Sequence, residues 1–365
     1  MSTDTRQLRL LCLISDEPGA TGVHRAAAMR RAGHEVEVFN PATLLRSGWV
    51  VDRARPRLGY RSSRNGIARA LERRFAGKRY DAIWVDGGMQ LGAAAVDRLR
   101  GNAPLIVNYN ADDPWGGRDG HRWDSYLQAV PEYDLVVVVR RPNVGEAVAS
   151  GARQVLRAWR TFDEIVHRPQ ALSQAEVVAL RSDVAFLGTW MPERGPILSA
   201  LVKSGLDVAI WGNRWQRAPE WPTLSRAWKG PALPNTQYSK ALQSTKVAIG
   251  LLSKGNRDLH THRSVEVPAI GTLLCAERTE EHEQVYGERG ALLWQDNDEC
   301  IERCVRLLAD DAARARVAER GQQRVRGYCL SNEPLVDAVL AAASRQTQIQ
   351  EWPPELAAPT SPLST

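Results

Sequence analysis

Short apolar runs alternate with longer helical stretches along the first third of the chain. The apolar run 8–15 is followed by the turn DEPGATG and by a helical pattern over 21–32, which Gly33 ends. A further apolar run covers 35–39 and completes a strand–helix–strand unit. Two strands joined through a helix normally lie side by side and point the same way, so this unit predicts a parallel sheet.

The same alternation continues to about residue 151. The further elements predicted here are helices at 64–77 and 90–100, strands at 81–85, 104–108 and 134–139, and a helix that begins at Pro142 and ends at Gly151. They extend one parallel sheet with helices packed against it, which is an α/β arrangement.

A second series of strands and helices begins at Asp183. Its predicted strands are 183–187, 207–211, 246–251, 272–275 and 291–294, and its predicted helices lie near 196–203, 236–243, 280–286, 300–308, 310–326 and 333–345. The segment 161–181 between the two series is polar, contains Pro169 and has no strand pattern. We therefore place the junction between two doubly wound, Rossmann-like domains there.

These elements lead to an expected domain plan. It consists of an N-terminal domain over 1–165, a linker over 166–181, a C-terminal domain over 182–328, a terminal helix over 329–349 and a tail over 350–365. The tail reads QEWPPELAAPTSPLST, and its content of Pro, Ser and Thr predicts disorder. A chain of 365 residues is long enough for two domains that each bury a core.

Composition narrows the class of protein. Hydrophobic residues make up 43% of the chain and charged residues 25%, which is typical of globular proteins. No apolar run approaches the roughly 18 residues of a membrane span, and the first residues lack the apolar core of a signal peptide. We therefore expect a soluble cytoplasmic protein. The five cysteines include no CxxC pair, which favours reduced structural thiols over disulfides or zinc ligands.

The net charge of +6 comes mostly from scattered arginines and favours anionic ligands such as nucleotide phosphates. A nucleic-acid-binding protein would cluster its basic residues beside exposed aromatics, so we expect no nucleic-acid partner. The predicted first helix carries Arg25, Arg30 and Arg31. These residues form either a solvated face or a peripheral contact with the inner face of an anionic membrane or a lipid-linked acceptor.

Loops that follow strands are candidate ligand sites, because doubly wound sheets bind ligands at the carboxyl ends of their strands. In GTWMPER at 188–194, Gly188 permits close backbone approach beside Thr189, and Arg194 can add a charged fork, which suits a diphosphate. An ordinary turn with a solvated arginine is the alternative. In IWGNRW at 210–215, Gly212 again follows a predicted strand. Trp215 of the same segment either flanks a nucleobase or fills a core.

The stretch 254–277, KGNRDLHTHRSVEVPAIGTLLCAE, concentrates charged and polar chemistry before an apolar strand. A carboxylate at Glu266 can accept both hydroxyls of a ribose, and Arg263 can offset the charge of a leaving diphosphate. The other candidates of this stretch, for the sugar and phosphate side, are Asp258, His260 and His262. The HxH pair has no third ligand at suitable spacing, so we expect no metal. A solvated charge cluster is the alternative.

Four segments together carry a family resemblance. They are DVAFLGT at 183–189, IWGNRW at 210–215, NRDLHTHRSVEVPAIG at 256–271 and LCAERTEE at 274–281. In this order and spacing they resemble the second domain of the CgeB-like glycosyltransferases, which are relatives of the group-1 glycosyltransferases. The resemblance covers 183–328, and NADDPW at 110–115 and the strand at 134–138 also look like the family's first domain.

The resemblance implies a GT-B fold, a nucleotide-sugar donor held mainly by the second domain and an acceptor held mainly by the first. Group-1 enzymes carry two glutamates separated by seven residues. Here the second is Glu266, expected to bind the ribose, and the first position is Asp258, expected to contact the transferred sugar. Gly188 and Arg194 stand where relatives place their diphosphate-binding residues. In GT-B relatives a terminal helix often crosses back to the first domain.

We therefore predict a metal-independent glycosyltransferase, of the hexosyltransferase kind, without a cofactor other than its nucleoside-diphosphate-sugar donor. The acceptor is a saccharide, a lipid, a small molecule or a protein. Inversion of configuration would need a base, for which Asp16, Asp112 and Asp113 are candidates, although DDPW also suits a plain turn. Retention, toward which the resemblance points, would need none.

Two other enzyme classes fit the same fold. A nucleotide-sugar epimerase, or another GT-B protein that transfers no sugar, would use the same donor contacts without an acceptor. A dinucleotide-dependent dehydrogenase is disfavoured because the first turn, DEPGATG, lacks the GxGxxG pattern and Asn40 stands where an acidic residue is needed.

Overall fold

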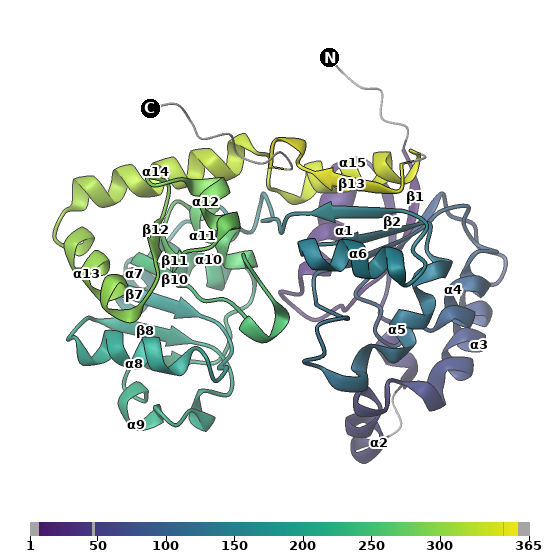
Figure 1. Ribbon diagram of the computed structural model, residues 1–365, viewed down its shortest axis with the longest axis horizontal. Coiled ribbons are helices and arrows are strands. Elements are labelled where there is room, and N and C mark those ends of the chain that lie inside the picture. Colours follow the sequence, from purple (N-terminus) through teal and green to yellow (C-terminus); the bar gives the residue numbers. More distant parts are fainter. Residues whose placement is uncertain (1–6, 46–47, 346, 357–365) are drawn as a thin grey trace. The chain divides into compact units, whose positions relative to one another are not determined.

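The computed structural model describes residues 7–45, 48–345 and 347–356. It divides into two compact units, each built around a parallel sheet (Figure 1). Of the described residues, the first unit contains those from 7 to 159, 255–257 and 332–354, and the second contains 160–254, 258–331 and 355–356. The α/β class with two parallel sheets agrees with the prediction.

The first unit has a seven-stranded sheet in the order β13-β6-β5-β4-β3-β1-β2, and all its neighbours pair in parallel. The strands are β1 Arg9–Leu13, β2 Glu35–Phe39, β3 Ala82–Asp86, β4 Ile106–Asn110, β5 Leu135–Val138, β6 Val155–Ala158 and β13 Ile349–Trp352. The strand order reverses between β1 and β3, which is where doubly wound sheets bind ligands.

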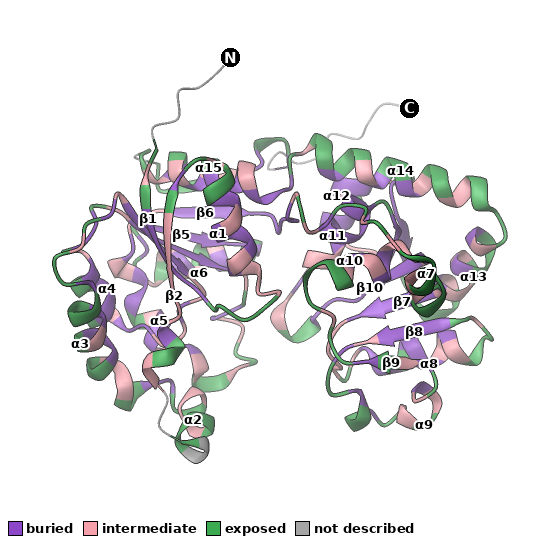
Figure 2. Cartoon of the chain, turned by 180° about the vertical axis from the view of Figure 1, so that it is seen from behind, coloured by how far each residue is buried: buried purple, intermediate pink, exposed green. Residues whose placement is uncertain are grey.

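Helices cover both faces of this sheet. They are α1 Thr21–Arg31, α2 Trp49–Ala54, α3 Arg64–Phe75, α4 Ala93–Leu99, α5 Asp124–Ala129, α6 Arg141–Ala149 and α15 Asn332–Ala343. One face buries Leu71, Phe75 and Tyr126 in a core with α3, α4 and α5. On the other face, Met29 of α1 and Val339 of α15 share a second core with the strands. Figure 2 shows the central strands as buried, the edge strand β2 as mostly intermediate, and the outer faces of the helices as exposed.

The second unit has a six-stranded parallel sheet in the order β12-β11-β10-β7-β8-β9. Its strands are β7 Ser182–Leu187, β8 Val208–Trp211, β9 Trp228–Gly230, β10 Thr245–Gly250, β11 Leu273–Glu277 and β12 Leu292–Trp294. Its helices are α7 Gln174–Leu180, α8 Gly195–Lys203, α9 Trp221–Leu224, α10 Asn235–Gln243, α11 His262–Ile270, α12 Glu280–Tyr286, α13 Asn297–Leu308 and α14 Asp311–Gly327. Short 3-10 turns link several elements of both units.

The C-terminal helix α15 packs against α1 in the first unit, and its Glu333 pairs with Arg31 at 2.5 Å. The expectation of a disordered tail is wrong for residues 350–356, because β13 pairs with β6 from Ile349 opposite Val155, and a 3-10 turn follows at Pro354–Leu356. The rest of the expected tail, 357–365, lies outside the described residues.

Two predictions from composition concern the cysteines and membranes. All five cysteines are free thiols, and Cys275 of β11 meets Cys300 and Cys304 of α13 in the apolar core, with Sγ–Sγ distances of 3.8 Å. Among the described residues, no helix has the length and apolar content that a membrane crossing needs.

Candidate functional site

Two glycine loops lock together at the carboxyl ends of β7 and β8. Gly188 donates its N–H to the carbonyl of Trp211 at 2.8 Å, and Trp190 donates to Asn213 at 2.9 Å. Gly212 has a φ of +147°, and a Cβ there would collide with the carbonyl group of Gly188. Only glycine therefore allows the two backbones to approach this closely.

Trp215 belongs to the core beneath these loops. Its ring has no exposed surface and packs edge-on against Phe186 at 5.8 Å, while its indole N–H donates to the carbonyl of Gly188 at 2.9 Å. The prediction that Trp215 contacts the donor directly is thus corrected: the residue fixes the shape of the Gly188 loop from below.

Two arginines bring positive charge to the same loop. The guanidinium groups of Arg194 and Arg263 lie 5.5 Å and 5.3 Å from the centre of the Phe186 ring. Arg194 donates to the carbonyl of Thr189 at 2.9 Å, and Arg263 donates to the carbonyl of Leu187. A carbonyl and an aromatic face orient Arg263 without neutralising it, so the end of β7 offers positive charge beside the backbone of the predicted diphosphate loop.

Glu266 lies on α11, the helix that begins with the half-buried His262. One oxygen of its carboxylate accepts the Tyr238 hydroxyl at 2.7 Å, and the other lies 3.7 Å from Nε2 of His167. Burial, followed by the charge of Glu266, raises the pKa of Tyr238 well above its ordinary value, so Tyr238 remains a donor. The carboxylate of Glu266 is thus held in place from one side by a fixed hydrogen bond.

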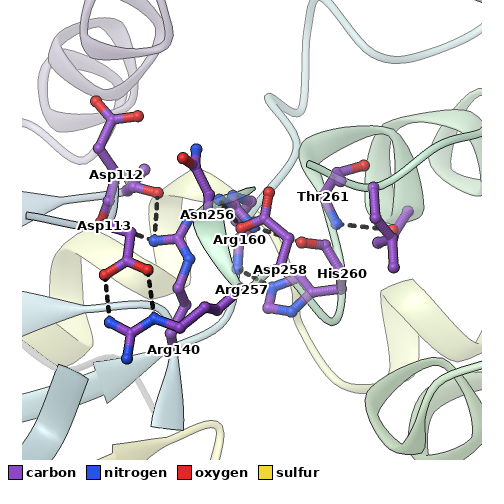
Figure 3. Close-up of polar contacts among 12 residues, drawn as sticks. Asp112, Asp113, Arg140, Arg160, Asn256, Arg257, Asp258, His260 and Thr261 are labelled. Atoms are coloured by element: carbon purple, nitrogen blue, oxygen red, sulfur yellow. Dashed lines mark hydrogen bonds and ion pairs between the residues drawn. The ribbon is translucent and has the colours of Figure 1, made fainter. Parts of the chain in front are cut away.

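Asp258 forms a buried ion pair with Arg160 at 3.1 Å, and the two side chains are 4% and 6% exposed (Figure 3). This burial argues against the predicted contact of Asp258 with the transferred sugar. The carboxylate instead compensates the charge of Arg160, whose guanidinium also donates to the carbonyl of His260 at 2.5 Å. We assign Asp258 a positioning role for the loop before α11.

Both ring nitrogens of His260 are engaged within the protein. Nε2 accepts the backbone N–H of Arg160 at 3.1 Å, so Nδ1 carries the proton and donates to the Glu281 carboxylate at 2.5 Å. The ring is 2% exposed. The prediction that His260 acts directly on the sugar is therefore corrected, and the same contacts occupy the nitrogens that a metal would need.

His282 shows the same use of a neutral imidazole. Its Nδ1 can only donate to the Glu277 carbonyl at 2.7 Å, so Nε2 accepts the Ser264 hydroxyl at 2.7 Å. Burial lowers the pKa of His282 to about 4, and the hydrogen bond to Glu277 opposes this only in part. The ring therefore joins α11 to α12 in its uncharged form.

A pH-dependent stability follows from His282. An unfolded histidine takes up a proton below about pH 6.5, whereas the folded residue takes it up only near pH 4. Stability is therefore complete above pH 6.5 and falls by about 3 kcal/mol as the pH decreases to 4. Urea unfolding between pH 7 and pH 4 should show a smaller decrease for His282→Asn than for the unchanged protein. The exposed His121→Asn is the control, and equal slopes for all three proteins would contradict the assignment.

In the first unit, Asp113 is buried in a network of ion pairs and hydrogen bonds. Arg257 holds both its oxygens at 2.6 Å and 2.7 Å and also pairs with Glu146 at 2.8 Å (Figure 3). Asn143 adds a hydrogen bond at 2.8 Å. Burial raises the pKa of Asp113, but the hydrogen bonds from Arg257 and Asn143 outweigh it and lower the pKa overall. The prediction that Asp113 is a catalytic base is corrected, because such a carboxylate is a poor proton acceptor.

Asp112 differs from its neighbour because its side chain is exposed. Figure 3 shows its carboxylate turned away from Arg140, which instead donates to the backbone carbonyl of Asp112 at 2.7 Å. Asp112 lines a cavity of about 470 Å³ at the carboxyl ends of β1, β3 and β4. This is the reversal point of the strand order, and the volume lies in the range of small-molecule sites.

Asp86, which lines this cavity, belongs to a buried ion pair. Arg25 donates to the two oxygens of Asp86 at 2.7 Å and 2.9 Å, and its guanidinium lies 4.2 Å from the centre of the Tyr109 ring. Since Arg25 is only 2% exposed, neither alternative for the arginines of α1, a membrane contact or a solvated face, holds for this residue. Arg30 and Arg31 are exposed, and Arg30 donates to the carbonyl of Val36.

Several residues of these networks were absent from the sequence-based candidates. They are Asp86, Arg160, Tyr238, Arg257 and Glu281. Arg257 and Glu281 lie inside the segments 256–271 and 274–281 that carried the family resemblance, so a signal for both was present. The other three pair with residues at least 28 positions away, and no local pattern marks them.

Comparisons with known proteins agree with this geometry. Residues 194–335 match the family model described as glycosyl transferase-like. No curated protein sequence matches the chain. Among solved structures, sucrose-phosphate synthase from Thermosynechococcus elongatus is 15% identical and aligns over 92% of this chain and 100% of its own, with a TM-score of 0.67.

Two further structures align over almost the whole chain. HepE from Anabaena, in complex with UDP-glucose, is 14% identical over 93% of this chain and 100% of its own, with a TM-score of 0.61. A structure assigned to a UDP-N-acetylglucosamine 2-epimerase from Listeria monocytogenes is 10% identical over 95% and 100%, with a TM-score of 0.58. At these identities the likeness concerns the fold, and it shows that the chain has the GT-B fold.

Proposed function

We propose that the protein is a glycosyltransferase, of the hexosyltransferase kind, that moves a sugar from a nucleoside-diphosphate sugar to an acceptor without a metal ion. The observation that carries this proposal is the pair of interlocked glycine loops at the ends of β7 and β8, with Arg194 and Arg263 beside them. The match of 194–335 to a glycosyl transferase-like family supports it.

In this proposal the second unit binds the donor. The backbone at Gly188 and Thr189 receives the diphosphate, and Arg263 supplies the opposing charge. Glu266 accepts the ribose hydroxyls, because a carboxylate has about four lone-pair sites and Tyr238 occupies one of them. His262, at the start of the same helix, is placed at the donor side. The cavity of the first unit receives the acceptor.

The reaction breaks the bond between the anomeric carbon and the diphosphate oxygen, and the diphosphate leaves with the electron pair. The acceptor hydroxyl oxygen forms the new bond to the anomeric carbon. In a retaining course, which we propose from the family resemblance, the acceptor proton passes to the leaving diphosphate. Negative charge grows on the diphosphate as the bond breaks, so fixed positive charge beside it stabilises the transition state more than the ground state. The anomeric configuration of the product, read by NMR, tests retention.

The first test is binding. Titration calorimetry of the full chain with UDP, ADP, GDP and CDP should show binding of at least one, and failure of all four would refute the proposal. The matching nucleotide sugars then serve for turnover, with and without EDTA. An epimerase would release an isomerised sugar in the absence of any acceptor, whereas a transferase forms a glycosidic product only when an acceptor is present.

Replacing Glu266 with glutamine should weaken binding of the preferred nucleoside diphosphate by roughly 10- to 100-fold, because a hydrogen bond to a charged group contributes about 1.5–3 kcal/mol. The glutamine keeps an oxygen for Tyr238, so the effect reports on lost charge. The exposed Glu302→Gln is the control. The unchanged protein and Glu266→Gln are then titrated with the 2′- and 3′-deoxy forms of the nucleotide. If Glu266→Gln lowers the affinity for these deoxy forms as much as it lowers the affinity for the ribose form, Glu266 does not contact the ribose.

A further inference from the structure

The cavity of the first unit has an acidic lining in a chain whose net charge is +6. Three carboxylates line it, from Glu17, Asp86 and Asp112, against one guanidinium, from Arg122. Asp86 is already compensated by the buried Arg25. Glu17 and Asp112 are exposed, so the rim facing a ligand is more acidic than basic. Asp16 adds a further carboxylate beside it, hydrogen-bonded at 2.7 Å to Asn40 of the lining.

One apolar part of the lining of the same cavity, the ring of Tyr60, is held by its backbone. Tyr60 lines it with 8% exposure and adopts a left-handed φ of 57°, which is uncommon for a tyrosine. The preceding Gly59 has no room for a Cβ, which would lie 2.5 Å from the carbonyl of His121. Arg122 is oriented by a contact of its Nε with the sulfur of Met89 at 3.3 Å. The ring of Tyr60 therefore adds an apolar contact of fixed position to the acidic lining.

We propose that this cavity selects an acceptor that is an uncharged or amine-bearing polyhydroxyl molecule, a small sugar or cyclitol, and discriminates against its phosphorylated or carboxylated counterpart. The inference rests on the proposed function, in which the first unit holds the acceptor. Carboxylates accept hydrogen bonds from neighbouring hydroxyl groups, and they attract an ammonium group. A phosphate placed beside Glu17 and Asp112 would meet like charges, and such juxtaposition weakens binding.

The test compares matched acceptors on the full chain loaded with its preferred nucleoside diphosphate. Glucose, glucosamine and myo-inositol are paired with glucose 6-phosphate, glucosamine 6-phosphate and an inositol monophosphate, and binding is followed by saturation-transfer NMR and calorimetry. We expect at least one unphosphorylated member to bind at least tenfold more tightly than its phosphorylated partner. Two results would overturn the proposal. One is tighter binding of the phosphorylated member. The other is no binding of any polyol up to 50 mM, a concentration that corresponds to a binding free energy of about 1.8 kcal/mol at a 1 M standard state.

Variants of Glu17 and Asp112 test whether these two carboxylates cause the preference for the unphosphorylated polyol. The double variant Glu17→Gln with Asp112→Asn should lose roughly tenfold or more in affinity for the polyol, and Glu17→Lys with Asp112→Lys should reverse the preference toward the phosphorylated partner. The exposed pair Glu288→Gln with Asp298→Asn is the charge-matched control. An unchanged preference in both rim variants overturns the proposal.

Nucleotide affinity separates this inference from the function on which it rests. All these variants should bind the nucleoside diphosphate as the unchanged protein does, because the rim belongs to the first unit and the donor residues to the second. Absence of nucleotide binding in the unchanged protein would instead refute the glycosyltransferase proposal.

Discussion

Replacement of Arg263 with methionine is expected to lower kcat for sugar transfer by roughly 10²- to 10³-fold, the loss seen when a fixed donor to developing charge is removed. Arg263 approaches the diphosphate loop from α11, with its guanidinium set by the Leu187 carbonyl and the Phe186 ring. A Cβ on Gly188 would lie 2.5 Å from Nη2 of Arg263, so the guanidinium directly adjoins the backbone of that loop. Methionine keeps most of the side-chain length and removes the charge.

The measurement separates ground-state from transition-state effects. We expect the affinity for the nucleotide sugar to fall less than kcat does, because the diphosphate of the intact donor gains its additional charge only as the bond breaks. Arg263→Lys should recover part of the rate, since it keeps charge without the planar fork. The exposed Arg316→Met on α14 is the control, and circular dichroism checks that each variant folds. A fall in affinity with kcat within twofold of the unchanged protein would remove Arg263 from the stabilisation of the leaving group.

Most strands that could be predicted from sequence are those with helices on both faces; the edge strand β2, with its alternating EVEVF, is an exception. Strands with helices on both faces are apolar on both sides and appear as continuous hydrophobic runs, as in LVVV of β5, which is buried throughout. The strands that were missed are short or polar: VLRA in β6, WKG in β9 and IQEW in β13. The tail strand β13 forms through its pairing with β6, nearly 200 residues away in sequence, which composition cannot reveal.

In the candidate site too, features that follow from local sequence could be predicted, and those that depend on distant partners could not. Gly188, Gly212 and Arg194 follow strands β7 and β8, as expected from the rule that ligands bind at carboxyl ends of parallel strands. Asp258 and Asp113 were also in the right loops, but their partners Arg160 and Arg257 come from 98 and 144 residues away. A carboxylate that finds such a partner is buried as an ion pair and is lost to chemistry, and only the tertiary structure decides whether one is present.

Replacing Asp86 with asparagine is expected to destabilise the first unit by about 3–5 kcal/mol, because removing one partner leaves the other as an uncompensated buried charge. The side chains of Arg25 and Asp86 are 2% and 16% exposed, and their two hydrogen bonds measure 2.7 Å and 2.9 Å. The surroundings are also tight, since a Cβ on Gly22 would lie 3.3 Å from the Asp86 carboxyl carbon. Because the Arg25 side chain is only 2% exposed, water cannot replace the lost carboxylate.

Two comparisons separate the lost pairing from other effects. Glu35→Gln breaks an exposed pair with Arg9, at 3.2 Å with side chains 65% and 46% exposed, and should cost less than about 1 kcal/mol. The double variant Arg25→Met with Asp86→Leu removes both charges and should recover most of the stability, because apolar replacement of a buried pair is often neutral or favourable. Calorimetric unfolding at pH 7 measures all three, with transitions assigned to each unit. If the double variant is less stable than Asp86→Asn, the cost lies in the packing around the cavity wall and not in a stranded charge.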